Sequence, residues 1–185
     1  MIKYFKLVYE FFSGLVYAFL ATNKSKLAQI FRRKILKTEC KIDKLVFIEN
    51  KKNFFADKGS ALYHGTHILN HNGKLLLGCK SHLGAYCHVN VCYGCITIGN
   101  NVAIGPQTNL VAYSNHYKKD KLVTATYLQK DIFIGNNVFI GSHVTVLPGS
   151  YIDDNVVIGA NSLVKGHLKS GCIYAGAPAK FVKFI

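Results

Sequence analysis

The sequence is poor in acidic residues: 9 Asp and Glu stand against 23 Lys and Arg, so the formal net charge of the 185-residue chain is +14 at pH 7. Such an excess of positive charge indicates an anionic partner, for example a nucleotide cofactor, a nucleic acid or an anionic membrane surface. No nucleic-acid-binding motif accompanies the charge, and the basic residues are scattered outside one stretch near the N-terminus. We therefore expect no nucleic-acid partner.

Long apolar runs and flexible linkers are also missing. A membrane-spanning helix needs about 20 apolar residues, and Lys3, Lys6 and Glu10 interrupt the apolar N-terminal stretch. A signal peptide cut after Ala21 is disfavoured, because Phe19 would occupy a position that needs a small residue. Since no Pro/Gly/Ser-rich linker divides the chain, we expect one folded domain with a sizeable core.

The sequence lacks the second cysteine pair that a zinc site would need. Its six cysteines include one lone Cys-x-x-Cys motif, Cys92 to Cys95, which is a weak signal by itself. We expect free thiols in a reducing cytoplasm, packed as small side chains in a narrow core. His64, His67 and His71 lie in a Gly/Asn-rich stretch without helical support, so we expect a polar turn and no metal.

Residues 1–40 are expected to form an amphipathic helical segment. Apolar residues recur there at helical spacings of three and four: Phe5, Val8, Phe12, Leu15 and Phe19. A basic cluster follows over residues 24–37. Two interpretations stay open: residues 1–37 contact the anionic inner face of a membrane, or the helix packs on the domain or on a neighbouring subunit. In both cases we expect a cytoplasmic protein, in the first case peripheral on the membrane.

What the sequence does contain is a six-residue period. From Ile98 onward an aliphatic residue, often followed by Gly, returns at Ile98, Ile104, Ile134, Ile140, Val146, Ile152, Ile158 and Val164. Six residues suit one short strand and one turn, so three units make a triangular coil, and stacked coils bury an aliphatic ladder. Residues 41–76 have weak periodicity, with strands expected at 45–48 and 75–77, and irregular early coils are expected there.

The period is interrupted twice. A shift by three positions between Val89 and Ile98 predicts an irregular corner around the Cys-x-x-Cys motif. A longer interruption over about residues 112–131 ends in register, which predicts a loop projecting from one face of a domain that spans residues 41–185. Such loops are commonly functional. His116 lies at the start of this loop, and a neutral imidazole is suited to act as a general base.

Three segments, residues 132–141, 148–149 and 175–180, resemble the hexapeptide-repeat acyltransferases, and the branch they resemble most is that of the sugar and galactoside O-acetyltransferases. The resemblance covers about residues 77–183. It implies a mainly β fold, a left-handed parallel β-helix, that assembles into a homotrimer with its sites between subunits. It also implies acetyl-CoA as the acyl-donor substrate.

The same resemblance implies roles for several residues. His116 would be the general base, and the backbone N–H of Ser142 would stabilise the oxyanion formed when a hydroxyl attacks the thioester. Asn90 matches an asparagine near the acceptor substrate. The group that orients His116 stays open, since Asp120, Asp131 or a backbone carbonyl could serve.

The resemblance also implies a path for CoA. The pantetheine arm would run along a groove between neighbouring β-helices and touch Phe139, Ser142 and Ala160. The phosphates would meet basic residues at Lys180, Lys183 and Lys165. Lys165 lies one residue from the family's usual Thr-Lys pair, and Gly166 replaces the lysine of that pair.

Together these features predict an acetyl-CoA-dependent O-acetyltransferase that acts on a hydroxyl of a sugar or surface-polysaccharide precursor. One alternative is N-acetylation of an amino sugar or a xenobiotic. A zinc carbonic-anhydrase-like enzyme shares this kind of solenoid, but Lys121 stands where it would need a second histidine. A non-catalytic β-helix scaffold is the third alternative, and the presence of His116 and Ser142 argues against it.

Overall fold

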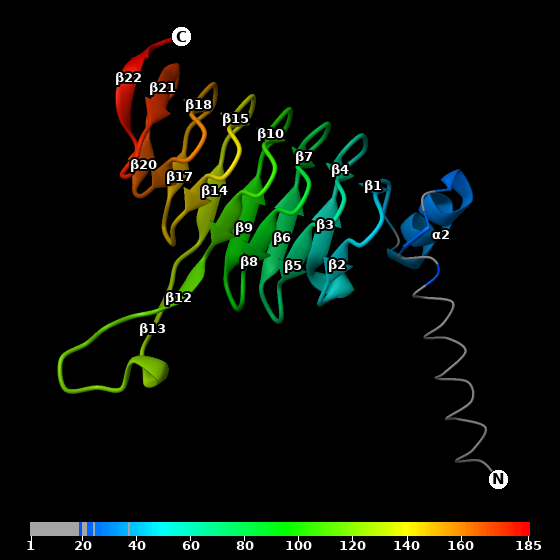
Figure 1. The fold of residues 1–185 in the computed structure, drawn as a ribbon, viewed down its shortest axis with the longest axis horizontal. Coiled ribbons are helices and arrows are strands. Elements are labelled where there is room, and N and C mark those ends of the chain that lie inside the picture. The colour runs from blue at the N-terminus through cyan, green and yellow to red at the C-terminus, as the bar shows by residue number, and fades with distance from the viewer. Residues whose placement is uncertain (1–18, 20–21, 24, 37) are drawn as a thin grey trace.

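The structure, a computed structural model, describes residues 19, 22–23, 25–36 and 38–185. From Lys41 onward the chain winds as a parallel β-helix in which short strands stack into three parallel sheets, the faces of a triangular prism (Figure 1). We call the sheets A, B and C in the order in which each coil visits them. The mainly β solenoid, the helical segment and the projecting loop that the sequence predicts are thereby confirmed.

The strands are short and regularly distributed among the sheets. Sheet A contains β1 (Lys41–Ile42), β4 (Ala61–Leu62), β7 (His82–Leu83), β10 (Ala103–Ile104), β15 (Phe139–Ile140), β18 (Val157–Ile158) and β21 (Cys172–Ala175). Sheet B contains β2 (Phe47–Ile48), β5 (His67–Leu69), β8 (His88–Asn90), β11 (Asn109–Val111), β16 (Thr145–Val146) and β19 (Leu163–Val164). Sheet C contains β3 (Phe54–Ala56), β6 (Lys74–Leu77), β9 (Cys95–Ile98), β14 (Ile132–Ile134), β17 (Tyr151–Ile152) and β20 (His167–Leu168). A short 3₁₀ turn, η1 (Lys51–Asn53), precedes β3.

The early and the later coils differ in length. In the later coils, paired residues such as Ile140 and Ile158 are 18 positions apart, which is three six-residue units. In the early coils the offset is 20 or 21 positions, as between Leu62 and Leu83. The longer coils explain why residues 41–76 show only a weak period. The expectation of irregular coils there is wrong, because these coils stack in the same parallel register.

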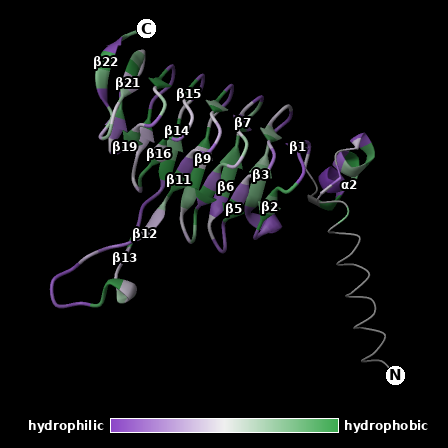
Figure 2. Cartoon of the chain, viewed as in Figure 1, coloured by the Kyte–Doolittle hydropathy of each residue, from purple (hydrophilic) through white to green (hydrophobic). Residues whose placement is uncertain are grey.

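The residues that set the six-residue period all point inward. Every one of them is buried, and across coils they stack directly on one another, with Ile104 against Ile140 and Ile140 against Ile158. Removing this apolar surface from water is the main stabilising contribution to such a fold. In Figure 2 apolar segments recur from coil to coil, whereas the outer part of the projecting loop is largely hydrophilic.

Left-handed backbone conformations turn the chain at the corners. Asn137, His143, Asn155 and Asn161 have φ between 54° and 58°, and Gly149 has φ 81°, so a left-handed residue recurs every six positions. Asparagine and glycine tolerate this region better than other residues do. The six-residue period therefore reflects both the inward side chain and the turn that follows it.

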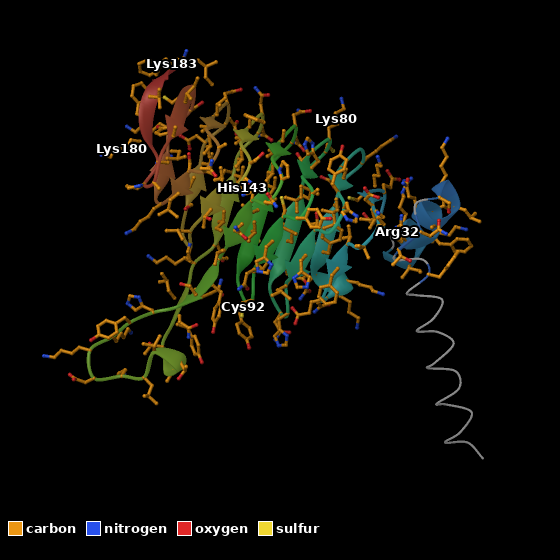
Figure 3. The ribbon with its side chains drawn as sticks, in the orientation of Figure 1. Arg32, Lys80, Cys92, His143, Lys180 and Lys183 are labelled. Atoms are coloured by element: carbon orange, nitrogen blue, oxygen red, sulfur yellow. The ribbon has the colours of Figure 1, made fainter. Side chains whose placement is uncertain are left out.

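Each corner forms a column along the prism, and we name the columns by the sheets they join. Figure 3 labels one left-handed residue of each: Lys80 at the C/A corner, His143 at the A/B corner and Cys92 at the B/C corner. The C/A corner is tied by side chains that accept hydrogen bonds from the next coil. Asn136 Oδ1 accepts from the N–H of Asn100 at 2.8 Å, and Asp154 Oδ1 accepts from that of Asn136 at 2.6 Å.

The two interruptions lie where the sequence places them, at the B/C corner. The phase shift falls between β8 and β9, and β9 compensates by burying both Ile96 and Ile98. The projecting loop leaves after β11 and returns to β14. Its stem pairs β12 (Tyr113–Asn115) with β13 (Tyr127–Gln129) in an antiparallel hairpin, and a short 3₁₀ turn, η2 (Val123–Ala125), lies between them.

Helix α2 (Lys26–Leu36) packs against the first coil. Its buried Arg32 donates through Nε to the carbonyl of Ile42 at 3.1 Å and through a terminal nitrogen to that of Asn23 at 3.0 Å. The predicted helix face of residues 5–19 lies outside the described residues, apart from Phe19. Within the described part of the chain, no helix is long and apolar enough to cross a membrane.

Candidate active site

The A/B corner carries a column of glycines that lets neighbouring coils approach closely. A Cβ on Gly105 would lie 2.6 Å from the backbone nitrogen of Ser142, and one on Gly141 would lie 2.6 Å from that of Ala160. Real Cβ atoms do not come so near to backbone. The residue after each glycine is small, so the column presents a smooth surface lined largely by backbone.

A groove of about 660 Å³ runs over this column and the adjoining edge of sheet A. Its lining residues are Asp43, Tyr63, His64, His82, Gly84, Ala85, Ala103, Ile104, Gly105, Pro106, Phe139 and Ser142. Two residues that the sequence predicts to touch the pantetheine arm, Phe139 and Ser142, therefore share one groove, and Ala160 lies exposed on the next coil.

The predicted oxyanion donor is available in this groove. Within the part of the chain that the structure describes, the backbone N–H of Ser142 makes no hydrogen bond, although its carbonyl accepts from Asn161 at 3.0 Å. A backbone N–H that faces a groove without an acceptor is a ready donor for a ligand oxygen. The position of Ser142 therefore suits the role that the resemblance implies.

His116 lies at a different corner from Ser142. It follows β12 in the projecting loop, which leaves the solenoid at the B/C corner, whereas Ser142 follows β15 at the A/B corner. Sheet B separates the two corners, and in Figure 1 the loop points away from the solenoid. One chain by itself does not bring the predicted base to its own groove.

The stem that carries His116 is well fixed. The backbone N–H of His116 donates to the carbonyl of Thr126 at 2.9 Å, and the Thr126 hydroxyl donates to the His116 carbonyl. The rings of Tyr113 and Tyr127 stack across the hairpin with centroids 5.4 Å apart. The imidazole itself is exposed and makes no hydrogen bond with the residues that the structure describes.

The two candidate partners for His116 have different surroundings. Asp131 accepts a hydrogen bond from the backbone N–H of Cys95 at 2.8 Å, so its carboxylate ties the base of the loop to the preceding coil. Asp120 is exposed at the tip of the loop, in a left-handed conformation. Neither carboxylate contacts the imidazole of its own chain, and the orienting group stays open.

Two further predicted residues share the B/C side with His116. Asn90 ends β8 and pairs with Val111, directly below the point where the loop leaves, and its carbonyl accepts from Ala112 at 2.9 Å. Lys165 is exposed after β19, at the same corner but nearer the C-terminus. Neither residue lines the groove of its own chain.

Lys180 and Lys183 lie on β22 (Lys180–Phe184), which pairs antiparallel with β21 and extends sheet A. An irregularity in this pairing inserts one extra residue opposite β21, so residues three apart come to the same face. Phe181 and Phe184 show this directly, because their ring centroids are 5.0 Å apart. The same offset places the two lysines on the other face of β22, in the sheet that also contains Phe139 (Figure 3).

The histidines that suggest a metal site do not converge. His64 lies at the A/B corner, His67 on sheet B and His71 at the B/C corner. Over the residues that the structure describes, no three His, Cys, Asp or Glu side chains are grouped so as to hold a metal ion. Within the described chain all six cysteines are free, and burial raises the pKa of the Cys87 thiol to about 11.

The N-terminal end of the groove contains residues that the sequence does not assign to the active site: Asp43, Tyr63, His64 and His82. One feature of the sequence could have pointed to them: Tyr63-His64 occupies the A/B corner, where later coils have Gly followed by a small residue. Burial lowers the pKa of the His82 imidazole, which favours the neutral ring. Burial also lowers the pKa of Arg32, against the opposing charge of nearby Asp43.

One segment of the solenoid matches a known family profile. A profile of the bacterial transferase hexapeptide family, with six repeats, matches residues 131–166. The matched segment comprises the 18-residue coils whose left-handed corners and inward aliphatic residues are described above. Residues 131–166 therefore carry the repeat of that family, and the resemblance that the sequence shows is confirmed.

Parts of the chain are similar in sequence to two proteins of Escherichia coli that are named as O-acetyltransferases. It is 38% identical over 90 residues to a galactoside O-acetyltransferase of Escherichia coli (strain K12), a match that covers 49% of this chain and 44% of that protein. It is 48% identical over 52 residues to a putative lipopolysaccharide biosynthesis O-acetyl transferase, WbbJ, of the same organism, covering 28% and 26%. The chain thus spans less than half the length of these two relatives.

Solved structures support the fold over most of the chain. AntD, an N-acyltransferase from Bacillus cereus in complex with dTDP and 3-hydroxybutyryl-CoA, superposes with a TM-score of 0.76. The match covers 84% of this chain and 87% of that one at 21% sequence identity. At this identity the likeness establishes the shared β-helix.

Proposed function

We propose that this protein transfers an acetyl group from acetyl-CoA to a hydroxyl of a sugar or surface-polysaccharide precursor. The observation that carries the proposal is the groove at the A/B corner, where a glycine column removes side chains and the Ser142 N–H has no acceptor. A thin, flexible arm ending in a thioester fits a surface of this kind. The relatives named as galactoside and lipopolysaccharide O-acetyltransferases support the acceptor class.

His116 and Ser142 have different roles in the proposed reaction. The His116 imidazole takes the proton of the acceptor hydroxyl as its oxygen bonds to the acetyl carbonyl carbon. The Ser142 N–H stabilises the negative charge on the carbonyl oxygen, a contribution of about 3 kcal/mol for one preorganised donor. The C–S bond then breaks, the proton on His116 passes to the thiolate, and the products are an acetyl ester and free CoA.

The donor extends from Ser142 toward the C-terminal end of the solenoid. Ala160 lies on the next coil, where a larger side chain would crowd the arm. Lys180 and Lys183 lie farther along the same sheet and are suited to the phosphates. The residues present therefore suit acetyl-CoA. The proposal assigns no role to a metal or to another cofactor.

The position of His116 requires a second copy of the chain. Since its loop leaves at the B/C corner and the groove lies at the A/B corner, a neighbouring chain must bring its loop to this groove. A closed three-fold ring meets this need equally at each interface, so we assign the protein a homotrimer with three sites. Asn90, on the same side as the loop, would enter the site with His116.

Replacing the base tests the assignment. His116→Ala should lower kcat by about 10²–10⁴-fold, because a general base is lost, with little change in the affinity for acetyl-CoA. His71→Ala, an exposed corner histidine, is the matched control and should keep the parental rate. Turnover is followed as CoA release with methyl galactoside, maltose and nucleotide sugars as acceptors, and amino sugars test N-acetylation. Near-parental kcat in His116→Ala would remove this residue from the mechanism.

Mixed oligomers test whether each site lies between chains. Ala160→Trp should block the groove, and His116→Ala should disable the loop, so neither variant alone turns over. Random co-assembly in equal amounts places an intact loop beside an intact groove in about a quarter of the interfaces, which should restore roughly a quarter of the parental rate. No recovery in a verified mixed oligomer would contradict a shared site.

We also propose that residues 1–37 bring the protein to an anionic membrane surface. Helix α2 exposes Leu27, Ile30, Phe31 and Ile35 beside the basic Arg33 and Lys34, a combination suited to an interface. Phe31→Ser with Ile35→Ser should weaken co-sedimentation with phosphatidylserine vesicles, while the melting temperature stays near that of the parent. Parental binding by this variant would contradict the role of α2.

A further inference from the structure

The groove continues beyond the position assigned to the thioester. Ser142 lies on the coil of β15, whereas Tyr63 and His64 lie on the coil of β4, three coils nearer the N-terminus. With neighbouring strands about 4.8 Å apart, this stretch is about 14 Å long. The donor extends from Ser142 in the opposite direction, so this part of the groove is not needed for the CoA arm.

The chemistry of the lining changes along the groove. Near Ser142 the surface consists of glycine, alanine, proline and Phe139, whereas the N-terminal end presents a carboxylate, a phenol and two imidazoles. His64 Nδ1 is buried and finds no hydrogen-bond partner within the described chain. A buried polar atom without a partner is costly unless a ligand or water satisfies it.

The charge of this end limits what it can bind. In a chain with net charge +14, none of the residues that line the groove is Lys or Arg. Two cations lie nearby but outside the lining: Lys41 over the Tyr63 ring at 5.6 Å, and Arg32 close to Asp43. A phosphate or carboxylate would meet no lining cation and would face Asp43, whereas hydroxyl groups can both donate to and accept from these side chains.

We propose that the N-terminal end of the groove, formed by Asp43, Tyr63, His64 and His82, binds an uncharged, hydroxyl-rich sugar ring of the acceptor. This inference rests on the proposed function and specifies which part of the site selects the acceptor. The reacting hydroxyl points toward Ser142, and the remaining hydroxyls face the polar end. His64 is held for this contact by the Tyr86 ring, which meets it edge-on with centroids 5.0 Å apart.

A matched pair of corner histidines tests the proposal. His71 and Tyr93 form a similar edge-on pair at the B/C corner, with centroids 5.6 Å apart, outside the groove. The probes are methyl galactoside and maltose, whose binding to the full chain is measured by saturation-transfer NMR with CoA present in excess. CoA binding is measured separately by calorimetry.

We expect the parent protein to bind at least one of the two sugars. His64→Phe should weaken that binding by about 5-fold or more, and Tyr63→Phe by about 2–5-fold, as losses of one or two hydrogen bonds. His71→Phe should leave it unchanged, and all variants should keep the parental CoA affinity. Galactose 6-phosphate should bind less well than galactose.

Several results would overturn the inference. One is that the parent binds neither sugar, and another is that His64→Phe and His71→Phe weaken sugar binding equally. A third is that galactose 6-phosphate binds more tightly than galactose, and a fourth is that the Tyr63 and His64 variants lose affinity for CoA. If His64→Phe disturbs folding or assembly, Tyr63→Phe, which removes a single oxygen atom, decides the question. Failure of the proposed function is separate, since it would appear as absent CoA binding or turnover in the parent.

Discussion

The early and the later coils of this solenoid share one core but have different surfaces. Both stack aliphatic side chains in parallel register, and both turn through left-handed residues. At the A/B corner, however, later coils carry glycine followed by a small residue, while early coils carry Asp43-Lys44 and Tyr63-His64. The inside of the coil thus varies little along the solenoid, whereas the corner changes from a smooth surface lined by glycine to a polar surface.

The largest effect should come from the core, where the two regions are expected to behave alike. Ile140→Ala in a later coil and Leu62→Ala in an early coil each remove a fully buried side chain. Each should lower the free energy of unfolding by about 2–5 kcal/mol, because a cavity remains between rigid coils. Denaturant titration measures both. A loss confined to one variant would show that the two regions do not share a continuous core.

A smaller effect should separate the regions at the corner. In Gly141→Ala the new Cβ meets the backbone of Ala160, which cannot move aside, so we expect a cost of about 1–3 kcal/mol and weaker CoA binding. In Gly65→Ala the Cβ meets the Tyr86 ring, which can rotate, and a strained φ of 69° costs about 1 kcal/mol. The affinity for CoA should change only in the Gly141 variant. Equal changes of CoA affinity in the two variants would contradict the difference between the two regions of the corner.

Charge at the C-terminal end should affect the donor alone. Changing Lys180 and Lys183 together to Gln should raise the KM for acetyl-CoA by about 10-fold with a smaller change in kcat. The difference should shrink at high salt, since exposed phosphate contacts are screened. The matched control changes Lys58 and Lys80, exposed lysines of the early coils, and should leave KM unchanged. An unaltered KM at low salt would place the phosphates elsewhere.

The smallest effect should be a pH dependence of stability that belongs to the early coils. His67 and His88 lie over one another on sheet B, with centroids 5.6 Å apart. Burial, and then the charge of His67, lower the pKa of His88. The unfolded chain therefore binds this proton first as the pH falls through about 6.5, and stability falls with it. His88→Gln should reduce the fall in melting temperature between pH 7.5 and 5, and His82, whose pKa burial also lowers, should account for a remaining slope.

The core could be predicted from the sequence because one physical rule repeats there. Inward side chains such as Ile134, Ile152 and Val164 each obey the same six-residue spacing, so their burial follows from position alone. The early coils were predicted less well, because 20 or 21 residues per coil displace the period even though the stacking is the same. Left-handed Leu45 turns a corner inside the stretch where a strand over 45–48 is expected.

The groove could be predicted only in part. Phe139, Ser142 and Ala160 lie on regular coils, so the repeat fixes their positions relative to one another. The polar residues at its other end come from coils of a different length, and no spacing rule connects Tyr63 with Ser142. The separation of His116 from the groove depends on which corner the loop leaves, which is a three-dimensional property of the prism.

Different elements cover the two ends of the solenoid. A stack of parallel strands offers its last backbone edge to any further strand, including one from another molecule, and can extend into a fibre. Helix α2 lies over the first coil, anchored by Arg32. At the other end β22 pairs antiparallel with β21 and occupies the last edge of sheet A. The strand that carries Lys180 and Lys183 thus also covers the edge of sheet A to which a further strand would add.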